Sequence, residues 1–186
     1  MEGRGNNVGM LKVTECELEG LKIIEPQVFA DDRGWFMELY RKEDYEEAGI
    51  CCEFVQDNRA YSKQGVLRGM HFQVKYPQDK LLSVLRGEIY DVAVDIRKDS
   101  KTYGKWFGIR LSDENKKQVF IPKGFAHGYL VLSKEAEILY KCSEIYHPED
   151  EGGIAWDDPK LAIQWPISVQ SELIISEKDR NWEGLL

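Results

Sequence analysis

The sequence predicts an all-β fold of the sandwich or jelly-roll type. Short runs rich in β-branched and aromatic residues recur along the chain. In "YDVAVDIR", residues 90–97, apolar and polar residues alternate, as they do in a half-buried strand. Turn signals such as Arg86-Gly87 and the polar stretch 112–115 separate these runs. About ten or more short strands at this spacing are typical of a sandwich or jelly roll.

The expected strands follow one another along the chain, and few helices interrupt them. "RKEDYEEAG", residues 41–49, predicts a short helix closed by Gly49, and a helical turn is expected near "SEKDRNWE", residues 176–183. Residues 1–9 are expected to form a loose tail of one domain that spans residues 1–186. The strand-like runs are "LKIIEPQVF", "GWFMELY", the run around His71, "KLLSVLRGEIYDVAVDIR", "KWFGIRL", "KQVFIP", "AHGYLVLS" and "AEILYKCSEIY".

Composition limits the class of protein. The chain has 186 residues, 42% of them apolar and 31% charged, which is an ordinary globular balance. The formal net charge of −8 argues against a general nucleic-acid binder, which usually carries a basic face. The opening "MEGRGNNVGM" lacks the apolar core of a signal peptide, and no apolar run approaches ~18 residues. We therefore expect a soluble cytoplasmic protein with no membrane partner.

The four cysteines predict no disulfide framework and no metal site. Cys51 and Cys52 are adjacent and cannot easily bridge to each other, and no CxxC pair occurs. Buried free thiols in a reducing compartment are the expected state of all four.

The run around His71 and the later "PKGFAHG" have the spacing of the two motifs of a cupin barrel. A metal-binding cupin would need four ligands at places that here hold His71, Gln73, Lys80 and His127. A lysine ammonium has no lone pair and repels a cation, so we expect no metal. With Arg68, these residues instead predict a cationic pocket for an anionic ligand at the mouth of the barrel. Surface basic residues around a core histidine are the plainer alternative.

Six segments together resemble one family, the dTDP-4-dehydrorhamnose 3,5-epimerases of the metal-free cupin superfamily. The resemblance covers about residues 20–183. Each segment alone is a moderate signal, whereas six in order at matching spacing are a specific one. They read "VFADDRGWFMELY", "FVQDNRAYSKQGVLRGMHFQ", "KLLSVLRGEIYDVAVDIRKDSKTYGKW", "IPKGFAHGYLVLS", "AEILYKCSEIYHPEDEGGIAWDDPKLAIQWP" and "SEKD".

The resemblance implies a cupin-type jelly-roll barrel and an isomerase without a cofactor. Members convert dTDP-4-dehydro-6-deoxy-D-glucose to dTDP-4-dehydro-L-rhamnose by inversion at C3 and C5 of the sugar. His71 takes the place of the base, Asp179 that of its carboxylate partner, Tyr140 that of the acid, and Lys80 lies near the C4 oxygen. The resemblance also implies that Tyr146 stacks on the thymine. The remaining substrate-binding places fall on Arg33, Glu38, Gln56, Asp57, Asn58, Arg68, His127, Glu151 and Lys178.

These residue types suit proton transfer next to a ketone. Loss of the hydrogen leaves an enolate, so the enzyme needs a base, a cation near the oxygen and an acid on the opposite face. Imidazole suits the base role at neutral pH, and a carboxylate partner fixes its tautomer. Considered alone, Tyr140 is more typical of a packed strand aromatic, Asp179 of a solvated or capping residue and Arg33 of a turn residue.

A strand-rich chain must cover its edges, so we expect a homodimer that exchanges N-terminal strands. Whether Arg33 and Glu38 then act in their own or in the neighbouring subunit's site stays open. Two other functions also stay open. One is a related epimerase or ketoisomerase of dTDP-sugars, including one that inverts C3 or C5 alone, and the other is a cupin that only binds a nucleotide sugar.

Overall fold

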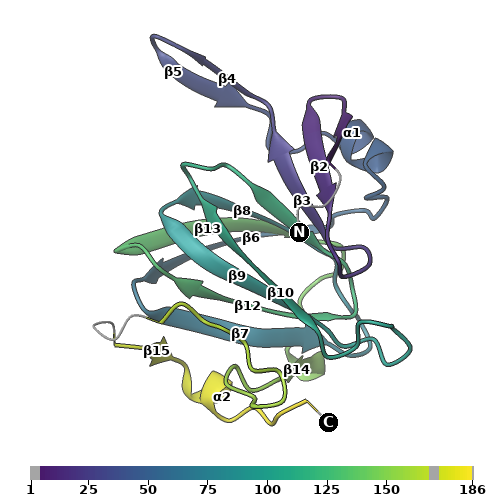
Figure 1. Cartoon of the computed structure of the whole chain (residues 1–186), viewed down its shortest axis with the longest axis vertical. Helices are drawn as coiled ribbons and strands as arrows, with labels where there is room; N and C mark the ends of the chain where they lie inside the picture. The colour runs from purple at the N-terminus through teal and green to yellow at the C-terminus, as the bar shows by residue number, and fades with distance from the viewer. Residues whose placement is uncertain (1–4, 168–171, 186) are drawn as a thin grey trace.

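A computed structural model describes residues 5–167 and 172–185, and two β-sheets that pack face to face form the body of the protein (Figure 1). The larger sheet has seven antiparallel strands in the order β1-β2-β3-β11-β8-β13-β6. Non-sequential neighbours such as β11 and β8 are those expected of a jelly roll. Its strands are β1 (Gly5–Val8), β2 (Leu11–Glu15), β3 (Lys22–Pro26), β6 (Gln56–Lys63), β8 (Lys80–Arg86), β11 (Gln118–Ile121) and β13 (Glu135–Cys142).

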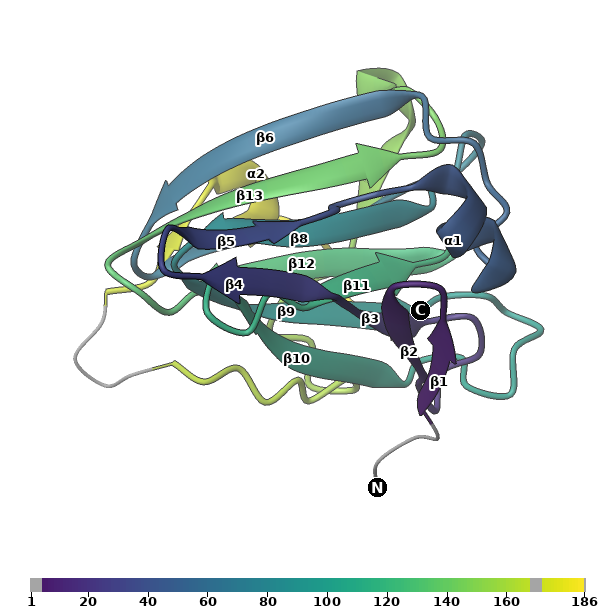
Figure 2. The same ribbon diagram turned by 90° about the horizontal axis from the view of Figure 1, so that it is seen from above.

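The smaller sheet runs in the order β10-β9-β12-β7-β14, and β15 adds a parallel pairing to β7. Figure 2 shows the two sheets from above, with β6, β13 and β8 on one side and β12, β9 and β10 on the other. The strands are β7 (Val66–Gln73), β9 (Glu88–Asp95), β10 (Trp106–Ser112), β12 (Phe125–Val131), β14 (Glu151–Gly153) and β15 (Ile174–Ile175). The all-β jelly-roll prediction is therefore confirmed.

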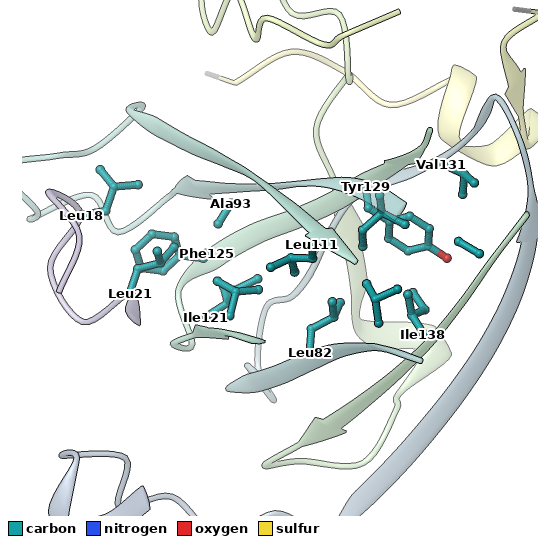
Figure 3. Packing of buried hydrophobic residues seen from close by; sticks show 14 residues of the cluster. Leu18, Leu21, Leu82, Ala93, Leu111, Ile121, Phe125, Tyr129, Val131 and Ile138 are labelled. Atoms are coloured by element: carbon teal, nitrogen blue, oxygen red, sulfur yellow. The ribbon is translucent and has the colours of Figure 1, made fainter. Parts of the chain in front are cut away.

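The main core lies between the sheets and is built from both. Figure 3 shows Leu82 and Ile138 of the larger sheet packed toward Ala93 and Leu111 of the smaller one. All four side chains are almost completely buried. Burial of each leucine and isoleucine side chain contributes roughly 1.5–3 kcal/mol, and it holds the two sheets together. Tyr129 reaches into this core from β12 and carries its hydroxyl with it (Figure 3).

The strand 90–97 is more deeply buried than the alternation of its residues predicts. Val92, Ala93 and Val94 are all buried, on both faces of β9. Ala93 faces the main core, whereas Val92 and Val94 contact a second cluster that includes Ile154 and Leu161. The prediction of a half-buried strand was wrong here, because the C-terminal segment covers the outer face of the sheet.

Both expected helices are present and short. Helix α1 (Lys42–Glu47) ends before Gly49, whose φ of +78° lies in the left-handed region that favours glycine. Helix α2 (Glu177–Arg180) is capped by Ser176, whose side chain accepts a hydrogen bond from the backbone N–H of Asp179. A 3-10 turn, η1 (Pro148–Asp150), precedes β14.

The N-terminal expectation needs a correction. Residues 5–8 form strand β1, which pairs with β2, so the loose tail predicted for residues 1–9 is wrong for this stretch. Residues 1–4 lie outside the described part of the chain.

Strands β4 (Val28–Asp31) and β5 (Gly34–Met37) form a hairpin that projects from the body of the protein (Figure 1). Its large apolar side chains are exposed, with Trp35 59% and Phe36 65% accessible, and Phe29 is half exposed. An exposed apolar hairpin of this kind is typical of a contact surface rather than of a free edge.

All four cysteines carry free thiols, and the burial expected of all four is found for Cys142 alone, because Cys16 and Cys52 are partly buried and Cys51 is exposed. Within the described ranges, no helix has the length and apolar character needed to cross a bilayer.

Candidate active site

Side chains from both sheets surround a cavity of about 380 Å³. The larger sheet contributes residues of β6, β8 and β13, and the smaller sheet contributes residues of β7, β12 and β14. Most of the predicted site residues therefore meet here. The lining consists of Gln56, Asn58, Ala60, Arg68, His71, Phe72, Gln73, Gln78, Lys80, His127, Gly128, Tyr129, Tyr140, Tyr146 and Glu151.

His71, on β7, contacts the carboxylate of Asp179. Nε2 of His71 lies 2.6 Å from Oδ1 of Asp179, and the backbone N–H of Gly69 donates to the other carboxylate oxygen at 3.3 Å. Burial raises the pKa of Asp179, but the hydrogen bond and charge of His71 outweigh it, so the pKa lies below its ordinary value. An ionised Asp179 fixes the tautomer in which Nε2 carries the proton and Nδ1 keeps the lone pair.

The position of Asp179 results from local structure in the C-terminal segment. Strand β15 pairs in parallel with β7, in the register Ile174 to Val66 and Ile175 to Leu67. Helix α2 begins directly after this pairing and lies against β7 (Figure 1). The Asp179 side chain, only 5% exposed, is thereby directed at His71.

A second imidazole–carboxylate pair lies in the same wall. His127 on β12 is the cross-strand neighbour of His71, and its Nε2 lies 2.7 Å from Oδ2 of Asp91 on β9. Both members of this pair are buried. The bond to Asp91 therefore orients His127 next to His71 in the wall of the cavity.

Lys80 and Tyr140 face these imidazoles from the larger sheet. Burial lowers the pKa of Lys80 below its ordinary value, and in the described ranges its ammonium has no hydrogen-bond or ion-pair partner. Burial raises the pKa of Tyr140 to about 12, so its phenol is protonated at neutral pH. The cavity therefore holds a potential base on one sheet, and a cation and a proton donor on the other.

Glu151 forms the polar rim of the cavity. It accepts hydrogen bonds from the Tyr146 hydroxyl and the Lys178 ammonium, and its other oxygen lies 3.9 Å from Nε2 of His71. The hydrogen bond to Glu151 is the main cause that raises the pKa of Tyr146 to about 12. The Tyr146 ring is half exposed at the mouth, where a planar base could stack on it.

Gln56, Asn58 and Arg68 add further polar groups to the lining. Gln56 donates to Asn58 and accepts from the backbone N–H of Tyr146, both at 3.0 Å. Arg68 is anchored by Ser62, which accepts from its Nε at 3.2 Å. The guanidinium nitrogens of Arg68 beyond Nε are then available to an anion.

The four places that a metal-binding cupin would use remain unsuited to a metal. Gln73 is buried, and its amide is engaged by backbone groups of Tyr76, Ile145 and His147. Lys80 contributes a positive charge. No group of three or more potential ligands occurs within residues 5–167 and 172–185.

Four predicted binding residues are absent from the lining of this cavity, and one of them, Lys178, contacts the lining through Glu151. Arg33, whose side chain is 90% exposed, lies in the turn of the β4–β5 hairpin and binds Asp31. Glu38 lines a separate, very small cavity with Arg41 and Asp44. Asp57 points to the opposite face of β6 from Gln56 and Asn58, and it accepts from Lys141 at 3.0 Å, because side chains alternate along a strand.

Sequence reasoning missed Asp91 and Tyr129. Tyr129 lies two residues after His127 on β12, so the period of a strand places it on the same face. That spacing was the available signal. Asp91 gave only a weak signal, because a polar residue in an alternating strand is usually assigned to the solvent side.

The family model for dTDP-4-dehydrorhamnose 3,5-epimerase matches residues 15–186. The chain belongs to the dTDP-4-dehydrorhamnose 3,5-epimerase family. A family member from Methanothermobacter thermautotrophicus is 58% identical over 171 residues, which cover 92% of each chain. The Pseudomonas aeruginosa epimerase is 50% identical, over 91% of this chain and 93% of its own length.

A solved epimerase structure has the same fold. The enzyme from Legionella pneumophila, in complex with dTDP-4-keto-L-rhamnose, superposes with a TM-score of 0.91 at 50% identity. The match covers 94% of this chain and 93% of that one. The family predicted from the six segments is therefore confirmed.

Proposed function

We propose that this chain converts dTDP-4-dehydro-6-deoxy-D-glucose to dTDP-4-dehydro-L-rhamnose, in deoxysugar synthesis, by inverting C3 and C5. One observation carries the mechanism. A histidine bound to a carboxylate and a protonated phenol line the same cavity from opposite sheets. A sugar ring between them presents one face to each, as inversion of a carbon centre requires.

In this proposal His71 is the base. Its Nδ1 takes the hydrogen next to the C4 ketone, while Nε2–H donates to Asp179. The ionised carboxylate stabilises the imidazolium that forms, as in other histidine–aspartate pairs. Asp179 also keeps the ring oriented, because it is itself fixed by the Gly69 N–H.

In this proposal the ammonium of Lys80 stabilises the negative charge on the enolate oxygen. Its lowered pKa makes the ammonium a stronger hydrogen-bond donor. A preorganised donor of this kind lowers the barrier by roughly 3–4 kcal/mol, because it binds the oxyanion more strongly than the ketone. His127, held by Asp91, lies on the opposite wall and is proposed to bind the sugar.

Tyr140 is the proposed acid. The pKa of about 12 keeps the phenol protonated until the enolate carbon accepts its proton. Return of a proton from this side inverts the centre, whereas return from His71 restores it. The same pair serves both centres, because C3 and C5 flank one ketone.

The nucleotide is proposed to lie toward the rim. Arg68 supplies the charge for the diphosphate, Tyr146 stacks on the thymine, and Gln56, Asn58, Glu151 and Lys178 supply polar groups around them. We propose no cofactor, because proton transfer next to a ketone involves no redox step.

We further propose a homodimer in which the β4–β5 hairpin packs on the second copy. The exposed apolar side chains Phe29, Trp35 and Phe36 support this arrangement. It would also explain why Arg33, at the hairpin turn, does not reach the cavity of its own chain (Figure 1). Glu38 follows the hairpin, and the same exchange would carry it toward the partner.

Incubation with dTDP-4-dehydro-6-deoxy-D-glucose in heavy water tests the reaction. We expect deuterium at C3 and C5 and formation of dTDP-4-dehydro-L-rhamnose, followed by NMR and mass spectrometry. Deuterium at one carbon alone would identify an enzyme that inverts a single centre. Binding without any exchange would identify a non-catalytic cupin.

A further inference from the structure

Trp182, two residues after α2, contacts the Asp179 carboxylate. Its indole N–H donates to Oδ1 of Asp179 at 3.4 Å, and the same oxygen binds Nε2 of His71. The Asp179 carboxylate is therefore contacted by three donors: the backbone N–H of Gly69, Nε2–H of His71 and the indole N–H of Trp182. Trp182 itself is absent from the cavity lining, so it is placed to act on the carboxylate and not on a bound sugar.

Gly153 makes room for the indole at this place. A Cβ added to Gly153 would lie 2.2 Å from Cε2 of Trp182, which is far inside van der Waals contact. Gly153 is also the cross-strand neighbour of His71 in the pairing of β14 with β7. The indole therefore packs directly beside the strand position of His71, and its N–H donates a hydrogen bond to Asp179, the carboxylate partner of that histidine.

The face of the same ring touches the rim of the site. The Lys178 ammonium lies 5.7 Å from the centre of the Trp182 ring, within reach of a cation–π interaction, and it binds Glu151. One aromatic ring thus contacts both the carboxylate behind His71 and the cation that holds the rim.

We propose that Trp182 is a positioning residue for the reaction, which fixes the rotation of the Asp179 carboxylate and thereby the orientation of the His71 imidazole. The inference rests on the proposed epimerase function. Without the indole N–H, the carboxylate keeps its bonds to Gly69 and His71 but gains rotational freedom, so the productive imidazole orientation is populated less often.

Trp182→Phe tests this role. We expect kcat to fall about tenfold, the order that the loss of one hydrogen bond to a charged group allows, with little change in KM. Solvent exchange and inversion should fall in parallel, because the base itself is affected. The matched control is Trp165→Phe, which removes an indole N–H that donates to the Trp156 carbonyl at 2.8 Å, outside the cavity lining. The control should keep the wild-type kcat.

A second replacement separates hydrogen bonding from packing. Benzothienylalanine at position 182 keeps the bicyclic ring but has no N–H, so it should lower kcat as Trp182→Phe does, without lowering Tm. Gly153→Ala, which displaces the ring, should lower kcat to a similar extent. Normal kcat in the benzothienylalanine protein would overturn the proposal even if Trp182→Phe were unstable.

The double variant Trp182→Phe with Asp179→Asn decides whether Trp182 acts through Asp179. We expect no further loss of kcat beyond that of Asp179→Asn alone, because the effects of two residues that act as a unit do not add. A full additional tenfold loss would overturn the positioning role. If the wild-type chain itself fails to turn over the dTDP-sugar, the proposed function fails, whereas an active wild type with an unchanged Trp182→Phe contradicts this inference alone.

Discussion

His71 and Asp179 lie 108 residues apart in the chain, yet Nε2 of the imidazole is 2.6 Å from Oδ1 of the carboxylate. The contact depends on the parallel pairing of β15 with β7, which brings the C-terminal segment alongside the strand that carries His71. Asp179 is buried and ionised, so the pair is preorganised before any ligand arrives.

Asp179→Asn is expected to lower kcat by a factor of about 10³–10⁴, the loss seen when such a carboxylate becomes an amide and the histidine adopts the wrong tautomer. His71→Ala should abolish turnover. Glu177→Gln is the control. It replaces an exposed carboxylate on the same helix and should leave kcat unchanged. Steady-state rates and circular dichroism check all three, and an active His71→Ala protein would contradict the mechanism.

Tyr140→Phe is expected to separate exchange from inversion. His71 can still form the enolate, but the proton then returns from its own face or slowly from water. The substrate should therefore take up deuterium with little inverted product. Tyr61→Phe, which loses a surface hydrogen bond to Glu135, is the control. Both rates are measured on one sample in heavy water, and inversion at the wild-type rate would exclude Tyr140 as the acid.

Lys80→Met is expected to lower kcat by about 10²–10³ with a small effect on KM, because the ammonium binds the enolate oxygen more strongly than the ketone. Lys141→Met on the outer face of β13, where Lys141 binds Asp57, should leave kcat unchanged. Steady-state kinetics distinguish a fall in kcat from a rise in KM. A rise in KM alone would assign Lys80 to substrate binding.

Mixing two inactive subunits tests the exchanged hairpin. If Arg33 acts in the partner's site, Arg33→Ala and His71→Ala chains form mixed dimers with one intact site out of two. After subunit exchange, random pairing of a C₂ dimer should restore about one quarter of the wild-type activity. Activity is measured at low substrate before and after co-refolding. No recovery, with mixed dimers verified by mass spectrometry, would place Arg33 in its own subunit's site or outside both.

Asp95→Asn is expected to weaken folding at neutral pH by about 2 kcal/mol, the cost of losing hydrogen bonds to a charged group. Burial raises the pKa of Asp95, but its bonds to Arg97, Ser100 and Thr102 outweigh this and lower the pKa. The stabilisation is complete above the ordinary Asp pKa of about 3.9 and is lost as the pH falls toward the lower value of the folded state.

The difference in unfolding free energy between wild type and Asp95→Asn should therefore shrink below about pH 4. Denaturant titrations at pH 7 and pH 3 check this, with the exposed Asp99→Asn as a control. A difference that grows in acid would contradict the assignment.

The sequence by itself determined the class of fold and the family. Alternating runs and turn signals predict the strands because each strand must present apolar residues to a core. The helix before Gly49 was predictable from its closing glycine, and the six segments identified the family because their order and spacing can be read along the chain without a fold.

Only the tertiary structure decided which of these residues meet. The resemblance implied that Asp179 is the partner of His71, but the contact itself depends on a strand pairing that no local pattern encodes. The burial of β9 on both faces likewise follows from a segment that packs on it later in the chain. Asp91 and Trp182 became site residues only through such contacts. The physical reason is that sequence periodicity reports which side of its own element a residue faces, whereas the group that it touches depends on how distant elements pack.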